Sequence, residues 1–261
     1  MKRCPLAAAI ALGLAFASAC RGPARPTAED KPFFVAHRGG IVPGIPENTL
    51  LAFREALRHG VDGIEVDLRG TADGEVVVLH DATVDRTTNG QGRVADLSFT
   101  ALRALDAGAG ERVPTLAEVL ELVRPHDVTL LLDIKESPTL DKARVVDLVR
   151  ASKAIDRVIV GCRSLDDLHA FQQLEPRLRT LGFLRRPEDV DDFARAGVDI
   201  VRFWPAWIRD EPQAVARVRA LGLPLWTTAG TATLAEVQAL VRSGADGVLS
   251  DYPMLQGALR H

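Results

Sequence analysis

The chain has 261 residues, of which 47% are hydrophobic and 26% are charged, and its formal net charge at pH 7 is −3. This composition is typical of a globular protein, and the length suits one barrel or two small domains. Because the basic residues are spread along the chain, the sequence argues against a nucleic-acid partner and shows no polybasic membrane patch.

The first 19 residues have the pattern of an export signal. Two basic residues precede an apolar run over residues 5–16, which is too short to cross a bilayer as a helix. Small residues at positions 17–19 then offer a cleavage site. The sequence therefore predicts a signal peptide over residues 1–19 and an exported mature protein.

Cys20 directly follows this cleavage site, as in the lipobox of bacterial lipoproteins, although Ala17 stands where that motif usually has leucine. We expect a lipidated Cys20, with residues 20–32 as a tether to the membrane. Ordinary cleavage, which leaves a soluble protein in the periplasm, is the alternative. Cys162 lies in a strand-like segment and is expected to be a buried apolar side chain.

Residues 33–261 alternate between short apolar runs and amphipathic segments, which is the pattern of a parallel α/β fold. The helical spacing of Leu50, Phe53 and Leu57 illustrates the amphipathic kind. In chain order, the patterns predict a strand at 33–36, a helix at about 49–59, strands at 64–68 and 75–79, helices at 97–105 and 114–124, a strand at 128–136, a strand at 158–162, a helix at 165–174, a strand at 180–184, a helix at 188–196, a strand at 200–203, a helix at 212–221, a strand at 223–227, a helix at 234–243 and a strand at 247–250.

Residues 63–81 form a predicted hairpin with chemistry on one face. Glu65 and Asp67 alternate with apolar residues, so both carboxylates point to the same side of the strand. With a turn centred near Ala72-Asp73, His80 lies roughly opposite Glu65. Hard divalent cations bind such oxygen ligands, and phosphoryl chemistry needs an acid or base beside the metal. For this segment alone, a solvated strand face with a capping histidine is the simpler explanation.

One of the nine predicted strands belongs to the antiparallel hairpin, which leaves eight for a parallel ring. The sequence therefore predicts a (βα)8 TIM-type barrel with an extra antiparallel strand and a small turn-rich insertion at residues 82–113, after the third strand. An open doubly wound sheet is disfavoured, because no glycine-rich phosphate loop opens the first helix. In a barrel, polar residues at the carboxyl ends of strands form the active site. Those at or near such ends are His37, Glu65, Asp67, Asp133, Lys135 and Trp226.

The motifs around these positions resemble those of the glycerophosphodiester phosphodiesterase family, in the family's order and from about residue 33 to 253. The segments that carry the resemblance are His37-Arg38-Gly39, Glu47-Asn48-Thr49, Glu65-Val66-Asp67, Asp73-Gly74 with His80-Asp81, Asp85-Arg86-Thr87-Thr88-Asn89-Gly90, Asp133-Ile134-Lys135, Leu225-Trp226-Thr227 and the run from Gly244 to Asp251.

The resemblance implies a barrel enzyme with a divalent metal and two essential histidines. By motif, Glu65, Asp67 and Asp133 would hold Ca²⁺ or Mg²⁺. His37 and His80 would be the general base and the general acid, a role that suits imidazoles near neutral pH. The nucleophile is either water or the glycerol 2-hydroxyl, the latter through a cyclic phosphate.

The same resemblance assigns the groups that hold the substrate. Arg38 and Lys135 would bind the phosphate oxygens, and Glu47 would steady Arg38 or a substrate hydroxyl. Trp226 would line the substrate pocket. Taken alone, Lys135 is an ordinary partner for a neighbouring carboxylate and Trp226 an ordinary core residue, and only their convergence at one barrel face favours the site.

Four positions depart from the family pattern. Asp133 stands where glutamate is frequent, and Thr227-Thr228-Ala229 replaces a Thr-Val-Asn segment. The fifth strand ends in Cys162-Arg163 instead of Ser-Phe, and Arg202-Phe203-Trp204 matches no family motif. We expect these positions to shape the pocket for the alcohol part of the diester.

The sequence therefore predicts an exported, metal-dependent phosphodiesterase that converts a small-molecule glycerophosphodiester into glycerol 3-phosphate and an alcohol. A lysophospholipase D-type enzyme is the near alternative, for which Phe203, Trp204 and Trp207 would supply an apolar mouth. A lipoprotein that binds phosphorylated ligands without catalysis is the alternative from another class.

Overall fold

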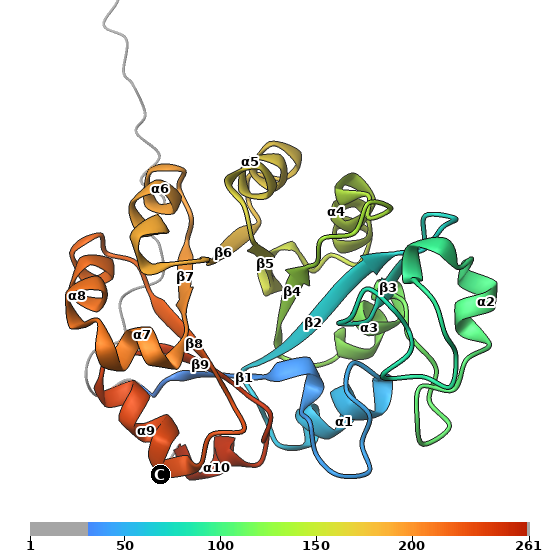
Figure 1. The fold of residues 1–261 in the computed structure, drawn as a ribbon, viewed down its shortest axis with the longest axis horizontal. Coiled ribbons are helices and arrows are strands. Elements are labelled where there is room, and N and C mark those ends of the chain that lie inside the picture. The colour runs from blue at the N-terminus through green and yellow to red at the C-terminus, as the bar shows by residue number, and fades with distance from the viewer. Residues whose placement is uncertain (1–30, 260–261) are drawn as a thin grey trace, which may run out of the picture.

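The computed structural model describes residues 31–259 as a barrel of strands surrounded by helices (Figure 1). The predicted signal peptide and Cys20 lie outside the described residues. Eight parallel strands form a ring in the order β1 (Phe33–Ala36), β2 (Gly63–Gly70), β4 (Thr129–Ile134), β5 (Val158–Cys162), β6 (Arg179–Phe183), β7 (Ile200–Phe203), β8 (Leu225–Gly230) and β9 (Gly247–Ser250). Because β1 pairs with both β9 and β2, the ring is closed. The predicted TIM-type barrel is confirmed.

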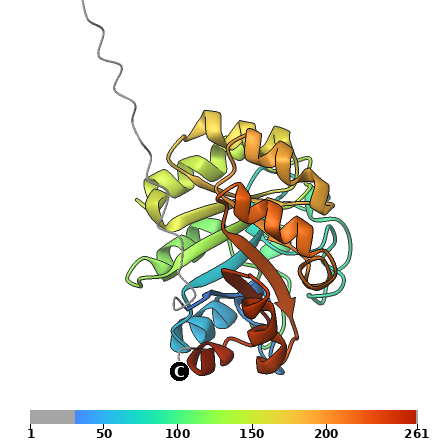
Figure 2. The same ribbon diagram turned by 90° about the vertical axis from the view of Figure 1, so that its left-hand side faces the viewer.

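Helices follow most of the strands and pack around the outside of the ring (Figure 2). They are α1 (Leu50–Arg58), α2 (Phe99–Arg103), α3 (Leu116–Val123), α4 (Lys142–Ala151), α5 (Leu165–Leu174), α6 (Val190–Arg195), α7 (Pro205–Asp210), α8 (Pro212–Ala220), α9 (Leu234–Arg242) and α10 (Leu255–Leu259). Their apolar faces and the outward faces of the strands form one large core. Within the described residues, no helix combines the length and the apolar character that a membrane crossing needs.

Three helices were not predicted from the sequence. The helix α4 was missed although its signals are present: Asp141 caps it by accepting a hydrogen bond from the Ala143 amide, and Val145, Val146 and Val149 are buried along one face. The helix α7 starts at Pro205 and is only six residues long. The helix α10 has five residues. Helices this short carry too little apolar periodicity to be detected in a sequence.

The hairpin of β2 and β3 (Val76–Val78) is the antiparallel addition outside the ring. Gly70 pairs with Val76, which centres the turn on Asp73. Continuing this register would place His80 opposite Val66, so the predicted pairing with Glu65 is one residue out. The strand β3 ends at Val78, and His80 therefore lies beyond the ladder.

The insertion at residues 82–113 packs on β3 through a small apolar cluster of its own. This cluster consists of Val77, Leu79, Val84, Val94, Leu102, Ala107 and Val113. The insertion contains α2 and a 3₁₀ helix at Val94–Asp96. It is a satellite of the hairpin, anchored beside the barrel.

The amino-terminal half of the barrel interior is filled by apolar side chains. Trp226 stacks on Phe33, with 5.0 Å between the ring centroids, and packs over Gly247. A Cβ atom at Gly247 would lie 2.5 Å from the indole, so this close approach requires a glycine. The other members of this interior cluster are Val35, Leu131, Ile159, Leu181, Phe183, Ile200 and Leu249. We call this interior cluster the apolar plug. The polar interior positions consequently lie above it, towards the carboxyl ends of the strands.

Candidate active site

Three buried carboxylates form the centre of the site. Glu65 and Asp67 extend inward from β2, and Asp133 lies on β4 directly across from Asp67 in the strand register. One carboxylate oxygen from each residue lies within 4.8 Å of the other two. Burial raises the pKa of Glu65 to about 8, and the nearby charge of Asp67 adds to this effect. Three carboxylates cannot be buried together without cations that offset their charge.

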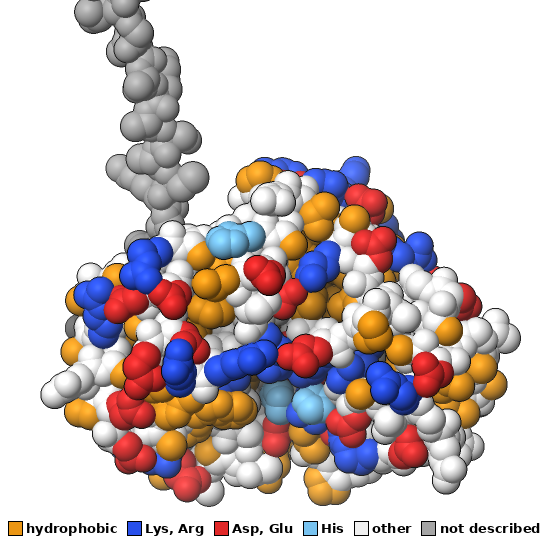
Figure 3. Space-filling model, turned by 45° about the horizontal axis from the view of Figure 1, so that its top comes forward, with side chains coloured by type: hydrophobic (Ala, Val, Ile, Leu, Met, Phe, Trp, Pro, Cys, Tyr) orange, Lys and Arg blue, Asp and Glu red, His pale blue; other side chains and the backbone are white. Residues whose placement is uncertain are grey.

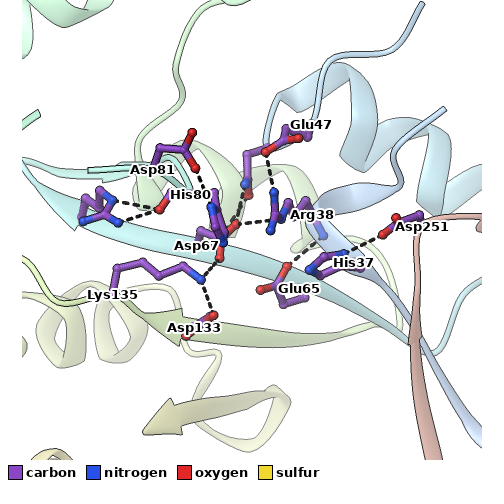
Figure 4. A network of polar contacts seen from close by, with 12 residues as sticks. His37, Arg38, Glu47, Glu65, Asp67, His80, Asp81, Asp133, Lys135 and Asp251 are labelled. Carbon is purple, nitrogen blue, oxygen red and sulfur yellow. Dashed lines mark hydrogen bonds and ion pairs between the residues drawn. The ribbon is translucent and has the colours of Figure 1, made fainter. Parts of the chain in front are cut away.

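Lys135 supplies one of these cations. Its Nζ lies 2.7 Å from Asp67 Oδ1 and 2.5 Å from Asp133 Oδ2 (Figure 4). Burial lowers the pKa of Lys135, but Asp133 and Asp67 outweigh this effect and raise it overall. Lys135 is therefore a fixed positive charge beside the carboxylates at neutral pH.

Arg38 supplies the second cation and is held by an unusual backbone. Its φ of 55° lies in the left-handed region, which a side chain other than glycine adopts at a cost. This turn directs the Arg38 amide to Glu65 Oε2 at 2.8 Å. The guanidinium donates from Nη1 to Glu47 Oε1 at 2.8 Å, and Nε lies 3.6 Å from Asp67 Oδ2. Both residues expected to bind phosphate thus lie beside the carboxylates, and Glu47 accepts a hydrogen bond from Arg38, which is one of the two contacts expected for it.

Each of the two predicted catalytic histidines is bonded to an aspartate. His37 Nδ1 lies 2.6 Å from Asp251 Oδ1, and His80 Nδ1 lies 2.7 Å from Asp81 Oδ1 (Figure 4). An aspartate at Nδ1 favours the tautomer that carries its proton there, and it leaves Nε2 for proton transfer. On the face of the molecule drawn in Figure 3, histidine side chains are exposed near the centre, and Lys and Arg side chains lie close to them.

The two imidazoles have different electrostatic environments. Burial lowers the pKa of His37, but the hydrogen bond to Asp251 and the charge of Glu65 outweigh burial and raise it overall. Burial and the positive charge of Lys135 lower the pKa of His80. The directions of these two pKa shifts are the reverse of those that a base at His37 and an acid at His80 need, since a base acts when unprotonated and an acid when protonated.

Arg86, from the insertion, forms hydrogen bonds with Asp81, beside His80, and with Glu47, beside Arg38. Its Nε and Nη2 donate to Asp81 at 2.6 and 3.1 Å, while Nη2 and Nη1 donate to Glu47 at 2.7 and 3.0 Å. Glu47 therefore accepts from Arg38 and Arg86 together. These hydrogen bonds lower the pKa of Glu47 although burial acts in the opposite direction.

The network includes residues that were not predicted as site residues. Examples are Arg86, Asp251 and Asn48. The Asn48 amide donates to Asp67 Oδ2 at 2.6 Å, while the neighbouring Thr49 caps α1. All three occur inside motifs that carried the resemblance. The motifs therefore pointed to these residues, although the chemistry of each residue type alone did not.

Trp226 lies deeper than a residue at the mouth of the barrel. Its side chain is 5% exposed and contacts Phe33, which begins β1 four residues before His37. The ring therefore belongs to the apolar plug beneath the carboxylates. Its predicted contact with the substrate stays a prediction.

Comparison with known proteins agrees with this arrangement. Residues 37–255 match the model of the glycerophosphoryl diester phosphodiesterase family. The chain belongs to this family. A glycerophosphodiester phosphodiesterase of Caldanaerobacter subterraneus subsp. tengcongensis is 34% identical over 236 residues, which cover 85% of this chain and 95% of that protein.

Solved structures of the family share the fold. A glycerophosphodiester phosphodiesterase of Agrobacterium tumefaciens superposes with a TM-score of 0.75 at 31% identity, covering 87% of this chain and 99% of that one. An Oleispira antarctica phosphodiesterase, solved in complex with the product sn-glycerol-3-phosphate, has a TM-score of 0.79 at 23% identity, covering 88% and 97% of the two chains. At that identity the likeness supports the fold.

Proposed function

We propose that the protein hydrolyses glycerophosphodiesters to glycerol 3-phosphate and an alcohol. The observation that carries this proposal is the pair of histidine–aspartate contacts beside three buried carboxylates and two fixed cations. The relative at 34% identity bears the name of this activity, and the Oleispira antarctica enzyme binds glycerol 3-phosphate as its product.

The carboxylates fit a divalent cation such as Ca²⁺ or Mg²⁺. Their oxygen donors are the type that such cations prefer, and Asp133 Oδ1 is buried without a hydrogen bond. Burial, together with the charge of Asp67, raises the pKa of Glu65, and a bound cation would oppose this effect. We therefore propose Glu65, Asp67 and Asp133 as the metal ligands. A bound cation would polarise the phosphoryl group and offset its charge.

The chain's own residues then bind, orient and transfer protons. Arg38 and Lys135 face the phosphoryl oxygens and offset the charge that grows on them in the transition state. His37, with its proton on Nδ1 towards Asp251, accepts the proton of the attacking hydroxyl at Nε2. His80, oriented by Asp81, delivers a proton from Nε2 to the oxygen of the departing alcohol.

The raised pKa of His37 is compatible with its role as the base. Part of the rise comes from the negative charge of Glu65. A cation bound beside Glu65 would counter that charge and bring the pKa of His37 down. The imidazole would then be free to accept a proton near neutral pH.

The first experiment is hydrolysis of glycerophosphocholine by the mature protein in Ca²⁺, in Mg²⁺ and in EDTA. We expect glycerol 3-phosphate to be released with either or both cations and release to stop in EDTA. Detection of a cyclic phosphate by ³¹P NMR would identify the glycerol 2-hydroxyl as the nucleophile. Absence of hydrolysis in every condition, with the protein folded, would refute the proposed activity and favour a binding protein.

The structure gives little support to the lysophospholipase D alternative. Of the three aromatic residues expected at an apolar mouth, Phe203 is fully buried and Trp207 packs edge-on against it, with centroids 5.5 Å apart. Only Trp204 is exposed, at 45%. A single exposed ring is a small surface for an acyl chain, so we favour a small polar alcohol.

We also propose that the protein is exported and anchored through a lipid on Cys20. The support is the sequence pattern at residues 1–20, which precedes the described residues. Mass spectrometry of the mature amino terminus tests this proposal: a diacylglyceryl cysteine supports it, and an unmodified terminus after cleavage overturns the anchor.

A further inference from the structure

Arg202 is a buried cation without an acidic partner. Its side chain extends from β7 into the barrel, and the residue is 3% exposed. Nε and Nη1 are both buried and donate no hydrogen bond. Among residues 31–259, no carboxylate lies within ion-pair distance of it. A buried charge is costly unless something pairs with it.

Aromatic rings cover the faces of this guanidinium. Its Cζ lies 3.8 Å from the centroid of the Trp204 ring and 4.9 Å from that of Phe183. Contacts of this kind stabilise a cation but satisfy none of its N–H groups. Guanidinium N–H groups bind carboxylates and phosphates, and those at Nε and Nη1 are left without an acceptor.

Arg163 places a second guanidinium against the same ring. Its Cζ lies 4.8 Å from the centroid of Phe183, and its Nη2 donates to Asp133 Oδ2 at 2.5 Å. Burial lowers the pKa of Arg202 to about 10, and the positive charge of Arg163 contributes to this shift. The two guanidinium groups repel each other. An anion bound between them would offset this repulsion.

The scissile phosphate does not need this pair. A phosphodiester carries one negative charge, which Arg38, Lys135 and a cation held by the three carboxylates would be enough to offset. Arg202 lies on β7, opposite β2 in the strand order of the ring, and interacts with the carboxylates of Asp133 and Glu65 through their charge without forming an ion pair with either. The glycerol part of a glycerophosphodiester carries no charge. The alcohol part is consequently where a second anionic group would be found.

We propose that Arg202, together with Arg163, binds an anionic group on the alcohol part of the substrate, with Trp204 as the outer wall of this subsite. This inference rests on the proposed hydrolysis of glycerophosphodiesters and narrows its substrates to those with an acidic alcohol.

Glycerophosphoserine and glycerophosphoethanolamine provide the test, because they differ by one carboxylate. We expect kcat/KM of the wild type to be about tenfold or more higher for glycerophosphoserine, as a charge-assisted hydrogen bond predicts. Arg202→Gln should lose that preference, with glycerophosphoserine hydrolysis falling about tenfold further than glycerophosphoethanolamine hydrolysis. Arg202→Lys, which keeps the charge without the guanidinium, should restore part of it.

Arg185→Gln is the matched control. Arg185 follows β6, its side chain is 75% exposed, and it forms an ion pair with the exposed Glu136. This variant should keep the ratio between the two diesters. Thermal unfolding of all variants separates loss of recognition from loss of fold, because a purely structural Arg202 would lower both activities in parallel.

Two results would overturn the inference while leaving the proposed function intact: equal wild-type activity on both diesters, or an equal loss on both in Arg202→Gln. If the wild type hydrolysed neither diester, the proposed function would fail. Calorimetric binding of the two diesters would then test the anion subsite by itself. Tighter binding of glycerophosphoserine that Arg202→Gln abolishes would uphold the anion subsite. Equal or absent binding would overturn it.

Discussion

The two halves of the barrel mouth are built on different principles. On β1 and β2, with the hairpin and β4, the cations Arg38 and Lys135 and both histidines each contact a carboxylate. We call this the reaction half. On β5, β6 and β7, Arg163, Phe183, Arg202 and Trp204 form what we call the selection half, whose central cation is unpaired. The reaction half is organised before a substrate arrives, whereas the selection half is completed by its ligand.

The largest expected effect separates the two histidines of the reaction half. Replacing either with alanine should lower the rate on glycerophosphocholine about 10²- to 10⁴-fold, because a positioned proton donor or acceptor is lost. A substrate with 4-nitrophenol as the leaving alcohol needs no general acid. His80→Ala should therefore recover most of its rate on that ester, whereas His37→Ala should not.

His169→Ala is the control, since His169 is exposed on α5 away from the site. Recovery by His37→Ala instead of His80→Ala would reverse the assigned roles. Recovery by neither would mean that proton donation to the alcohol is not what limits the His80 variant.

Asp251→Asn should have the next largest effect. The carboxylate holds His37 through Nδ1 at 2.6 Å, and an amide can present the wrong group to the imidazole. We expect kcat to fall about tenfold or more with little change in KM, because Asp251 positions His37 and does not touch the substrate. Asp147→Asn, on the exposed face of α4, should change neither parameter. A change confined to KM would show that Asp251 acts on substrate binding.

Gly161→Ala should disturb the selection half through packing. A Cβ at Gly161 would lie 2.3 Å from Phe183 Cε2, the ring that carries both guanidinium groups. Overpacking of this kind costs about 1–3 kcal/mol of unfolding free energy. Urea denaturation measures this loss, and the preference for glycerophosphoserine should decline with it.

Gly257→Ala, in α10, is the matched control, because a Cβ there meets no atom within 4 Å. It should leave both stability and substrate preference unchanged. A Gly161→Ala variant as stable as the wild type would show that Phe183 can move, and hence that the selection half is looser than the packing indicates.

The smallest expected effect concerns Cys162, at the end of β5. Burial raises the pKa of its thiol, and the side chain is fully buried. The native protein should therefore react with a thiol reagent such as 5,5′-dithiobis(2-nitrobenzoate) only as fast as it opens, whereas the protein in urea reacts at once. Rapid reaction under native conditions would reveal local opening of the selection half.

The barrel could be predicted because its strands and helices alternate strongly. The predicted strands at residues 158–162, 200–203 and 247–250 coincide with the observed ones. The helices α7 and α10 were missed because their short length weakened their periodicity, whereas α4 was missed although it has ten residues and a capping aspartate. The hairpin register was one residue out, since a turn signal locates a loop but does not fix which residue lies at its centre.

Within the site, residues that share a strand were the easiest to predict. The spacing of Glu65 and Asp67 places both on one face, and the register then brings Asp133 alongside. Contacts between distant segments could not be predicted in this way. Asp251 approaches His37 across 214 positions, and Arg86 reaches Glu47 from the insertion. Such pairs depend on how the ring closes, which no local pattern encodes.

The hydrogen bonds of Arg86 make the insertion part of the catalytic apparatus. Arg86 belongs to a segment with a small cluster of its own, yet it fastens both Asp81, behind His80, and Glu47, behind Arg38. Small peripheral clusters open at a lower free energy than a barrel core. As denaturant is added, activity should therefore disappear before the barrel unfolds, because the insertion unfolds first and the hydrogen bonds of Arg86 to Asp81 and Glu47 are lost with it.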